Sequence, residues 1–238
     1  MSTTVSPGES VVAWSGAGAG PDKDCTPEDR ITRSLLGYGV LAGPFYVLVS
    51  LAQAVIRDGF DLRRHDWSLL ANGPAGWVQV ANLVVTGLMV VAAAGGYRRV
   101  LRGGVGQRWV PLLLATHGIG LVGAGIFRAD PMAGFPAGTP EGPPLAFTVH
   151  AMLHVVCAGI GFLALILATF VLAKRFGREG RHGRARVSVV TGVAFLAGFI
   201  GIASGSGTPP VVLTFTAAVL LVYGWLSETS AYLYRHLH

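Results

Sequence analysis

The sequence predicts an all-α integral membrane protein, a single bundle of six transmembrane helices. Hydrophobic residues make up 52% of the 238 residues and charged residues only 13%, whereas an average soluble domain has roughly 25% charged residues. Six apolar runs are long enough to cross a hydrocarbon core of about 30 Å, which takes roughly 20 helical residues. Because no water can bind backbone groups at that depth, each run is expected to be a helix. The sequence lacks the two-residue alternation of a membrane β-barrel.

The six spans follow one another with short or polar links between them. We expect them at residues 34–56, 75–96, 109–127, 147–173, 187–203 and 211–227. The first, third, fourth and fifth contain glycines at spacings that allow close helix contact. The fifth is the shortest, and the turn-rich link after it predicts an antiparallel hairpin with the sixth. Four tryptophans near the ends of the runs are expected to lie at the membrane interfaces, namely Trp67, Trp77, Trp109 and Trp225.

The first 33 residues differ from the rest of the chain. They combine several prolines and glycines with mixed charges and show no periodic apolar face, which predicts a disordered cytoplasmic tail over 1–33. The membrane domain is then expected over 34–230, followed by a short cytoplasmic tail over 231–238. A cleavable signal peptide has a basic start directly before its apolar core. Here the first apolar run begins only after residue 33, so the first span is expected to be retained.

The distribution of basic residues predicts the orientation of the bundle. With six spans, both termini and the even-numbered links share one side, and fourteen of the 18 Lys and Arg residues fall there, against four on the other side. Basic residues accumulate on the cytoplasmic side of membrane proteins, so both termini are expected in the cytoplasm. The net charge of +6 is therefore explained by topology, and no nucleic-acid partner is expected.

The two long external links carry most of the polar residues that could perform chemistry. The first contains His65 and Ser68, and the second contains Asp130. These three residues are the candidate catalytic groups, because both links are too long for minimal turns and mix acids, bases and aromatic residues. The alternative is that the two links are ordered caps whose charged groups pair with each other and with helix ends.

Two histidines near the start of the fourth span suggest a metal site. His150 and His154 lie four residues apart, which places them about 6 Å apart on one helix face. Together with His65, and with Asp130 as a fourth group, they could hold zinc or another metal. His117 lies deeper, and the sequence leaves open whether it joins this site. A non-metal polar site and hydrogen bonding between helices are the alternatives.

Several of these segments together resemble a family of bacterial membrane proteins catalogued as domain of unknown function 998. The segments are residues 57–77, Phe127-Arg-Ala-Asp-Pro131 with Gly134-Phe-Pro136, and the His150-x-x-x-His154 motif. The resemblance covers about residues 35–230. It implies a six-helix membrane protein without a settled activity.

A weaker likeness is to the CREST membrane hydrolases, the alkaline ceramidases and their relatives. Their zinc site is similar in chain order to Ser68 and His65, then Asp130, then the pair His150 and His154. That superfamily has seven spans and carries its paired histidines in the last one, and this chain differs in both respects.

The sequence thus predicts a multi-pass protein of the bacterial cytoplasmic membrane, in contact with membrane lipid. Its function is expected to be binding or acting on a lipid-like small molecule at a polar His and Asp site in the extracytoplasmic leaflet. One alternative is a non-catalytic assembly or stress-response factor, and another is a metal-dependent membrane hydrolase. A secondary transporter is disfavoured because the six spans show no obvious internal repeat.

The orientation can be tested by cysteine labelling with a membrane-impermeant reagent. In a background without Cys25 and Cys157, we expect Arg63→Cys and Ala133→Cys to react in intact cells. Gly103→Cys and Gly180→Cys should react only after the membrane is permeabilised, because the basic links are held in the cytoplasm. The reverse pattern would contradict the predicted orientation.

Overall fold

A computed structural model describes residues 26–237, and within this range the chain forms six long helices and one short 3₁₀-helix. The long helices are α1 (Pro27–Ile56), α2 (Gly76–Val100), α3 (Trp109–Ile126), α4 (Val149–Arg178), α5 (His182–Ala203) and α6 (Pro209–Arg235), and the 3₁₀-helix is η1 (Trp67–Ala71). All six long helices are long and apolar enough to cross a membrane. The described residues contain one isolated β-bridge, between Met132 and Phe135, and no sheet. The predicted all-α bundle of six spans is confirmed.

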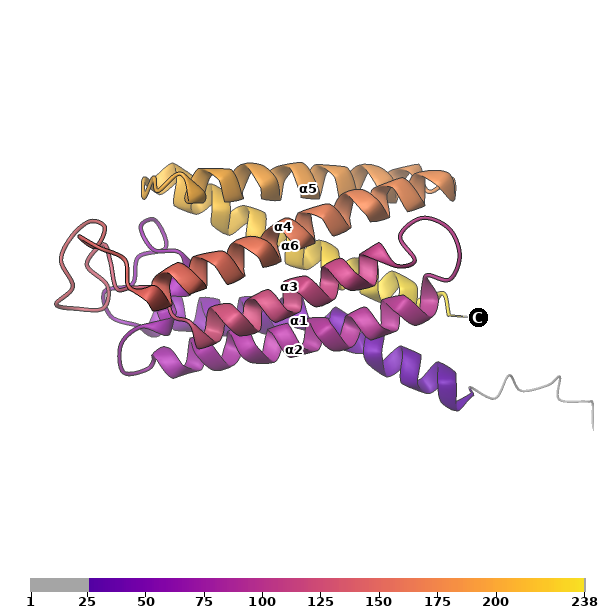
Figure 1. Cartoon of the computed structure of the whole chain (residues 1–238), viewed down its shortest axis with the longest axis horizontal. Helices are drawn as coiled ribbons and strands as arrows, with labels where there is room; N and C mark the ends of the chain where they lie inside the picture. The colour runs from indigo at the N-terminus through magenta and orange to yellow at the C-terminus, as the bar shows by residue number, and fades with distance from the viewer. Residues whose placement is uncertain (1–25, 238) are drawn as a thin grey trace, which may run out of the picture.

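The helices form a closed ring. Each long helix packs against the next one in the chain, and α6 returns to pack against α1. Figure 1 shows the long loops 57–75 and 127–148 gathered at one end of the bundle, which we call the loop end. The described N-terminal residues, the link between α2 and α3, and the C-terminus lie at the other end. We call this the basic end, because most of the Arg residues of the links lie there.

The helices extend beyond the predicted spans at the basic end. α1 begins at Pro27 rather than at residue 34, so residues 27–33 are helical instead of disordered. Thr26 forms a capping box with Asp29, and Pro27 fits the first turn, where no backbone N–H is needed. The rest of the predicted tail, residues 1–25, lies outside the described residues.

The same extension occurs where α2, α4 and α6 end and where α5 begins. Apolar runs mark only the hydrocarbon core, whereas a helix can continue into the headgroup region with long basic side chains on its surface. Hydropathy therefore underestimated the length of the helices at this end.

Glycines set the spacing of the central helices α2, α3 and α4. A Cβ atom added to Gly118 of α3 would lie 2.5 Å from the carbonyl oxygen of Gly87 in α2. One added to Gly120 would lie 2.7 Å from the carbonyl oxygen of Cys157 in α4. Without a side chain at these positions the backbones can approach closely, as the glycine spacing predicted.

Candidate functional site

The two long loops at the loop end are fastened to each other through Arg57. Its guanidinium donates hydrogen bonds of 2.5 Å to the carbonyl oxygens of Leu70 and Asn72. It also lies over the ring of Phe135 from the other loop, 4.9 Å from the centroid. Burial lowers the pKa of Arg57 below its usual value, but an arginine remains charged at every physiological pH. One cation thus connects η1, the end of α1 and the loop 127–148.

His65 lies buried between the same two loops. The backbone N–H of Asp61 donates to Nδ1 of His65 over 2.9 Å. Because Nδ1 accepts this bond, the neutral ring carries its proton on Nε2, which donates to the carbonyl oxygen of Ala133 over 2.9 Å. The ring also packs against Phe60 and Phe135. Both nitrogens of His65 are therefore engaged, Nδ1 within the loop 57–75 and Nε2 in joining it to the loop 127–148.

The other two candidate catalytic residues also make local structural contacts. Ser68 donates its hydroxyl to Asp66, which caps η1. Asp130 accepts hydrogen bonds from the backbone and the hydroxyl of Thr148, at 2.8 Å and 2.6 Å. Thr148 is the N-cap of α4, so Asp130 holds the start of that helix. These contacts agree with the alternative in which the loops are ordered caps.

The two histidines of α4 have different surroundings. His154 is buried, and its Nδ1 donates to the carbonyl oxygens of Ala124 and Phe127, each at 2.8 Å. It thereby satisfies the C-terminal end of α3, which has no further helical partners. His150 is exposed and packs edge-on against Phe127.

His117 lies in the bundle interior rather than with the loop residues. Its Nδ1 donates to the carbonyl oxygen of Gly161 in α4, 3.1 Å away. The hydroxyl of Tyr223 in α6 lies 3.3 Å from its Nε2 and can donate to it. His117 therefore links three helices across the ring.

The described residues contain no group of three or more His, Cys, Asp or Glu side chains placed to hold a metal ion. A metal bound by His65, His150 and His154 would require His65 to give up one of its two loop contacts. The zinc site, with Asp130 as its fourth group, stays a prediction.

Sequence reasoning missed a buried polar cluster between α1 and α2. The Nε2 of Gln53 donates to Oε1 of Gln79 over 2.7 Å, and Nδ2 of Asn82 donates to Ser50 Oγ and to the Tyr46 carbonyl oxygen, each at 3.1 Å. Such side chains act as hydrogen-bonding contacts between membrane helices. The sequence does contain the signal for this cluster, because Gln and Asn side chains occur within two otherwise apolar runs.

A second feature that sequence reasoning missed is a groove between α5 and α6 near the basic end. Figure 1 shows α6 running obliquely away from α5 toward the C-terminus. The groove has a volume of about 710 Å³, and its lining includes Val187, Leu220, Leu221 and Gly224. A smaller hollow of about 610 Å³ continues from it past Gly183 and Arg184.

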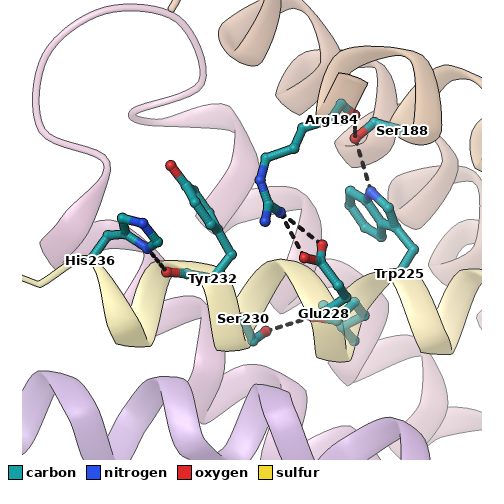
Figure 2. A network of polar contacts seen from close by, with 8 residues as sticks. Arg184, Ser188, Trp225, Glu228, Ser230, Tyr232 and His236 are labelled. Carbon is teal, nitrogen blue, oxygen red and sulfur yellow. Dashed lines mark hydrogen bonds and ion pairs between the residues drawn. The ribbon is translucent and has the colours of Figure 1, made fainter. Parts of the chain in front are cut away.

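A polar network lies in the part of the groove nearest the basic end. Figure 2 shows Arg184 of α5 reaching Glu228 of α6, where one guanidinium nitrogen donates to both carboxylate oxygens at 2.8 Å and 2.9 Å. Nearby, the indole N–H of Trp225 donates to Ser188 over 2.9 Å. Thr191 also lines the groove, and its hydroxyl is buried without a hydrogen-bond partner among the described residues.

Two guanidinium groups lie close to a single aromatic ring beside the groove. Arg184 lies over the ring of Tyr232 at 3.6 Å from the centroid, and Arg181 lies over the same ring at 4.8 Å. Glu228 is the only Asp or Glu in residues 180–238. This lone carboxylate beside an apolar span was a signal that the sequence offered.

Comparison with known proteins gives a family for this architecture. The family model described as "Protein of unknown function (DUF998)" matches residues 40–231. The chain belongs to this family. The match covers α2 to α5 completely and most of α1 and α6, and it confirms the first resemblance. The likeness to the CREST hydrolases stays a prediction. A search of curated proteins and a search of solved structures found no match.

The contacts of His65 predict that its side chain stabilises the folded protein. His65→Ala leaves the Ala133 carbonyl oxygen and the Asp61 N–H without partners, which costs about 1–3 kcal/mol, so the thermal midpoint in detergent should fall. His150→Ala is the matched control, because that ring is exposed and an exposed substitution changes stability by about 0.5 kcal/mol or less. Equal midpoints for the two variants would contradict the role of His65 as a fastener of the loops.

Proposed function

We propose that this DUF998 protein binds a membrane phospholipid in the groove between α5 and α6. The observation that carries the proposal is the combination of an apolar groove with a charged pair at one end. Val187, Leu220 and Leu221 offer a surface for an acyl chain, and Arg184 offers a cation for a phosphate group. Guanidinium groups bind phosphate oxygens through several directed N–H donors.

The unpaired hydroxyl of Thr191 supports a lipid occupant. A buried polar group without a partner is costly, and the ester carbonyl groups of a glycerophospholipid are hydrogen-bond acceptors located between its phosphate and its acyl chains. Thr191 lies seven residues deeper along α5 than Arg184, on the apolar side of the charged pair. A phospholipid with its phosphate at Arg184 would place its ester region beside Thr191, whose buried hydroxyl would turn toward the groove to donate a hydrogen bond to it.

The proposal also changes the expected place of the lipid-binding site. The sequence favoured a polar site at the loop end, but His65, Ser68 and Asp130 are each occupied by contacts within the loops. The proposed setting is the bacterial cytoplasmic membrane with the basic end in the cytoplasm. The lipid would then come from the cytoplasmic leaflet, and the protein would act as a lipid-binding membrane factor.

An assembly or stress-response role is compatible with lipid binding and stays a prediction. A metal-dependent hydrolase would need a reactive group beside the bound lipid. The ionisable residues that line the groove are Arg184 and Glu228, which bind each other. Lipid binding is therefore the activity that the groove supports best.

Filling the groove tests the proposal. Gly224 lines the groove, and a Cβ atom added there would meet nothing within 4 Å. Gly224→Phe should therefore occupy the groove, and phospholipid that copurifies after extensive detergent washing should fall severalfold when it is measured by mass spectrometry. Gly37→Phe is the matched control, since a Cβ atom added at Gly37 in α1 also meets nothing within 4 Å. Equal lipid content in both variants and the unmodified protein would refute the groove as the binding site.

A further inference from the structure

We infer that the groove selects phospholipids whose headgroup carries a primary ammonium group, as in phosphatidylethanolamine. This inference rests on the proposed function and concerns the part of the lipid that Glu228 would contact. The charged side chains that line the groove are one cation, Arg184, and one anion, Glu228, from facing helices. A zwitterionic headgroup carries the opposite pair of charges on adjacent groups.

Glu228 retains capacity to accept further hydrogen bonds. A carboxylate offers about four acceptor positions, and Arg184 uses one position on each oxygen through a single nitrogen, Nη1. The side chain of Glu228 is 58% exposed and that of Arg184 is 31% exposed. The carboxylate is therefore reachable from the groove while it remains paired.

Arg184 is held in a position where it can bind a phosphate beside Glu228. Its guanidinium lies over the ring of Tyr232, and this stacking limits its rotation. Nη1 is directed at Glu228, which leaves the donors on Nε and Nη2 for a second anion. Binding a phosphate through Arg184 would place the headgroup next to the Glu228 carboxylate, which can accept hydrogen bonds from an ammonium group.

Different headgroups would be distinguished by hydrogen bonding and by charge. The ammonium of phosphatidylethanolamine has three N–H donors for the carboxylate, whereas the choline of phosphatidylcholine has none. The headgroup of phosphatidylglycerol carries no cation to neutralise Glu228. Phosphatidylethanolamine is therefore expected to bind most tightly, and phosphatidylcholine and phosphatidylglycerol are expected to bind more weakly.

The test is a native mass spectrometry titration of the delipidated full-length protein with these three lipids, all with identical acyl chains. We expect phosphatidylethanolamine to bind roughly threefold to tenfold more tightly than the other two. Glu228→Gln should reduce this preference to within about twofold while phosphatidylcholine binding is retained. Glu141→Gln is the control, because Glu141 pairs with Arg64 at the loop end and does not line the groove.

The outcomes separate the two proposals. If none of the three lipids binds the unmodified protein, the proposed function itself fails. If all bind equally, or phosphatidylglycerol binds most tightly, lipid binding stands and the selectivity is refuted in favour of general attraction by Arg181 and Arg184. A preference for phosphatidylethanolamine that survives in Glu228→Gln would also refute it. The comparison of the three lipids on the unmodified protein needs no variant. It therefore tests the headgroup preference even if Glu228→Gln fails to fold.

Discussion

Polar groups inside a hydrocarbon layer must find partners within the protein, and this constraint organises the bundle. Helices satisfy their own backbone groups, but their ends and their polar side chains need other elements. His154 satisfies the end of α3, and His117 joins α3, α4 and α6. Amides join α1 to α2. The closed ring of helices places all of these contacts away from lipid.

The loop end follows the same rule outside the spans. Arg57, His65 and Asp130 each bind backbone groups that would otherwise lack partners where helices end or begin. In the structure His65 and Asp130 join the loops and cap a helix, and their catalytic role stays a prediction. Charged and aromatic residues in a loop cannot be assigned to catalysis until their partners are known.

The α5–α6 groove is one of the places where a buried polar group lacks a partner among the described residues. There the hydroxyl of Thr191 is buried without a partner, and the Arg184 and Glu228 pair is partly exposed at the edge of an apolar surface. A lipid is the one component of the membrane that offers acyl chains, ester acceptors and a charged headgroup in this order. In the proposed function, a bound phospholipid supplies the partners of these polar groups.

The sequence predicted the six spans because apolar runs directly report the thickness of the hydrocarbon core. It could not predict the extra turns at the basic end, where Arg-rich segments such as 174–186 continue the helices beyond that core. It could identify His65 and His154 as polar residues in unusual places, but not their partners, because Ala133 and Phe127 contribute only carbonyl oxygens. The groove escaped prediction because it depends on how α6 diverges from α5, which no local pattern encodes.

The central claim is that a phospholipid occupies this groove, and site-specific photocrosslinking in the purified protein tests it most directly. Val187 lines the groove and is 56% exposed, whereas Val189 is 42% exposed and lies about 200° round the same helix. With p-benzoylphenylalanine in place of each valine, irradiation after detergent washing should add the mass of a phospholipid at position 187 and little or none at position 189. An absence of adduct at 187, or equal adducts at both positions, would contradict the account.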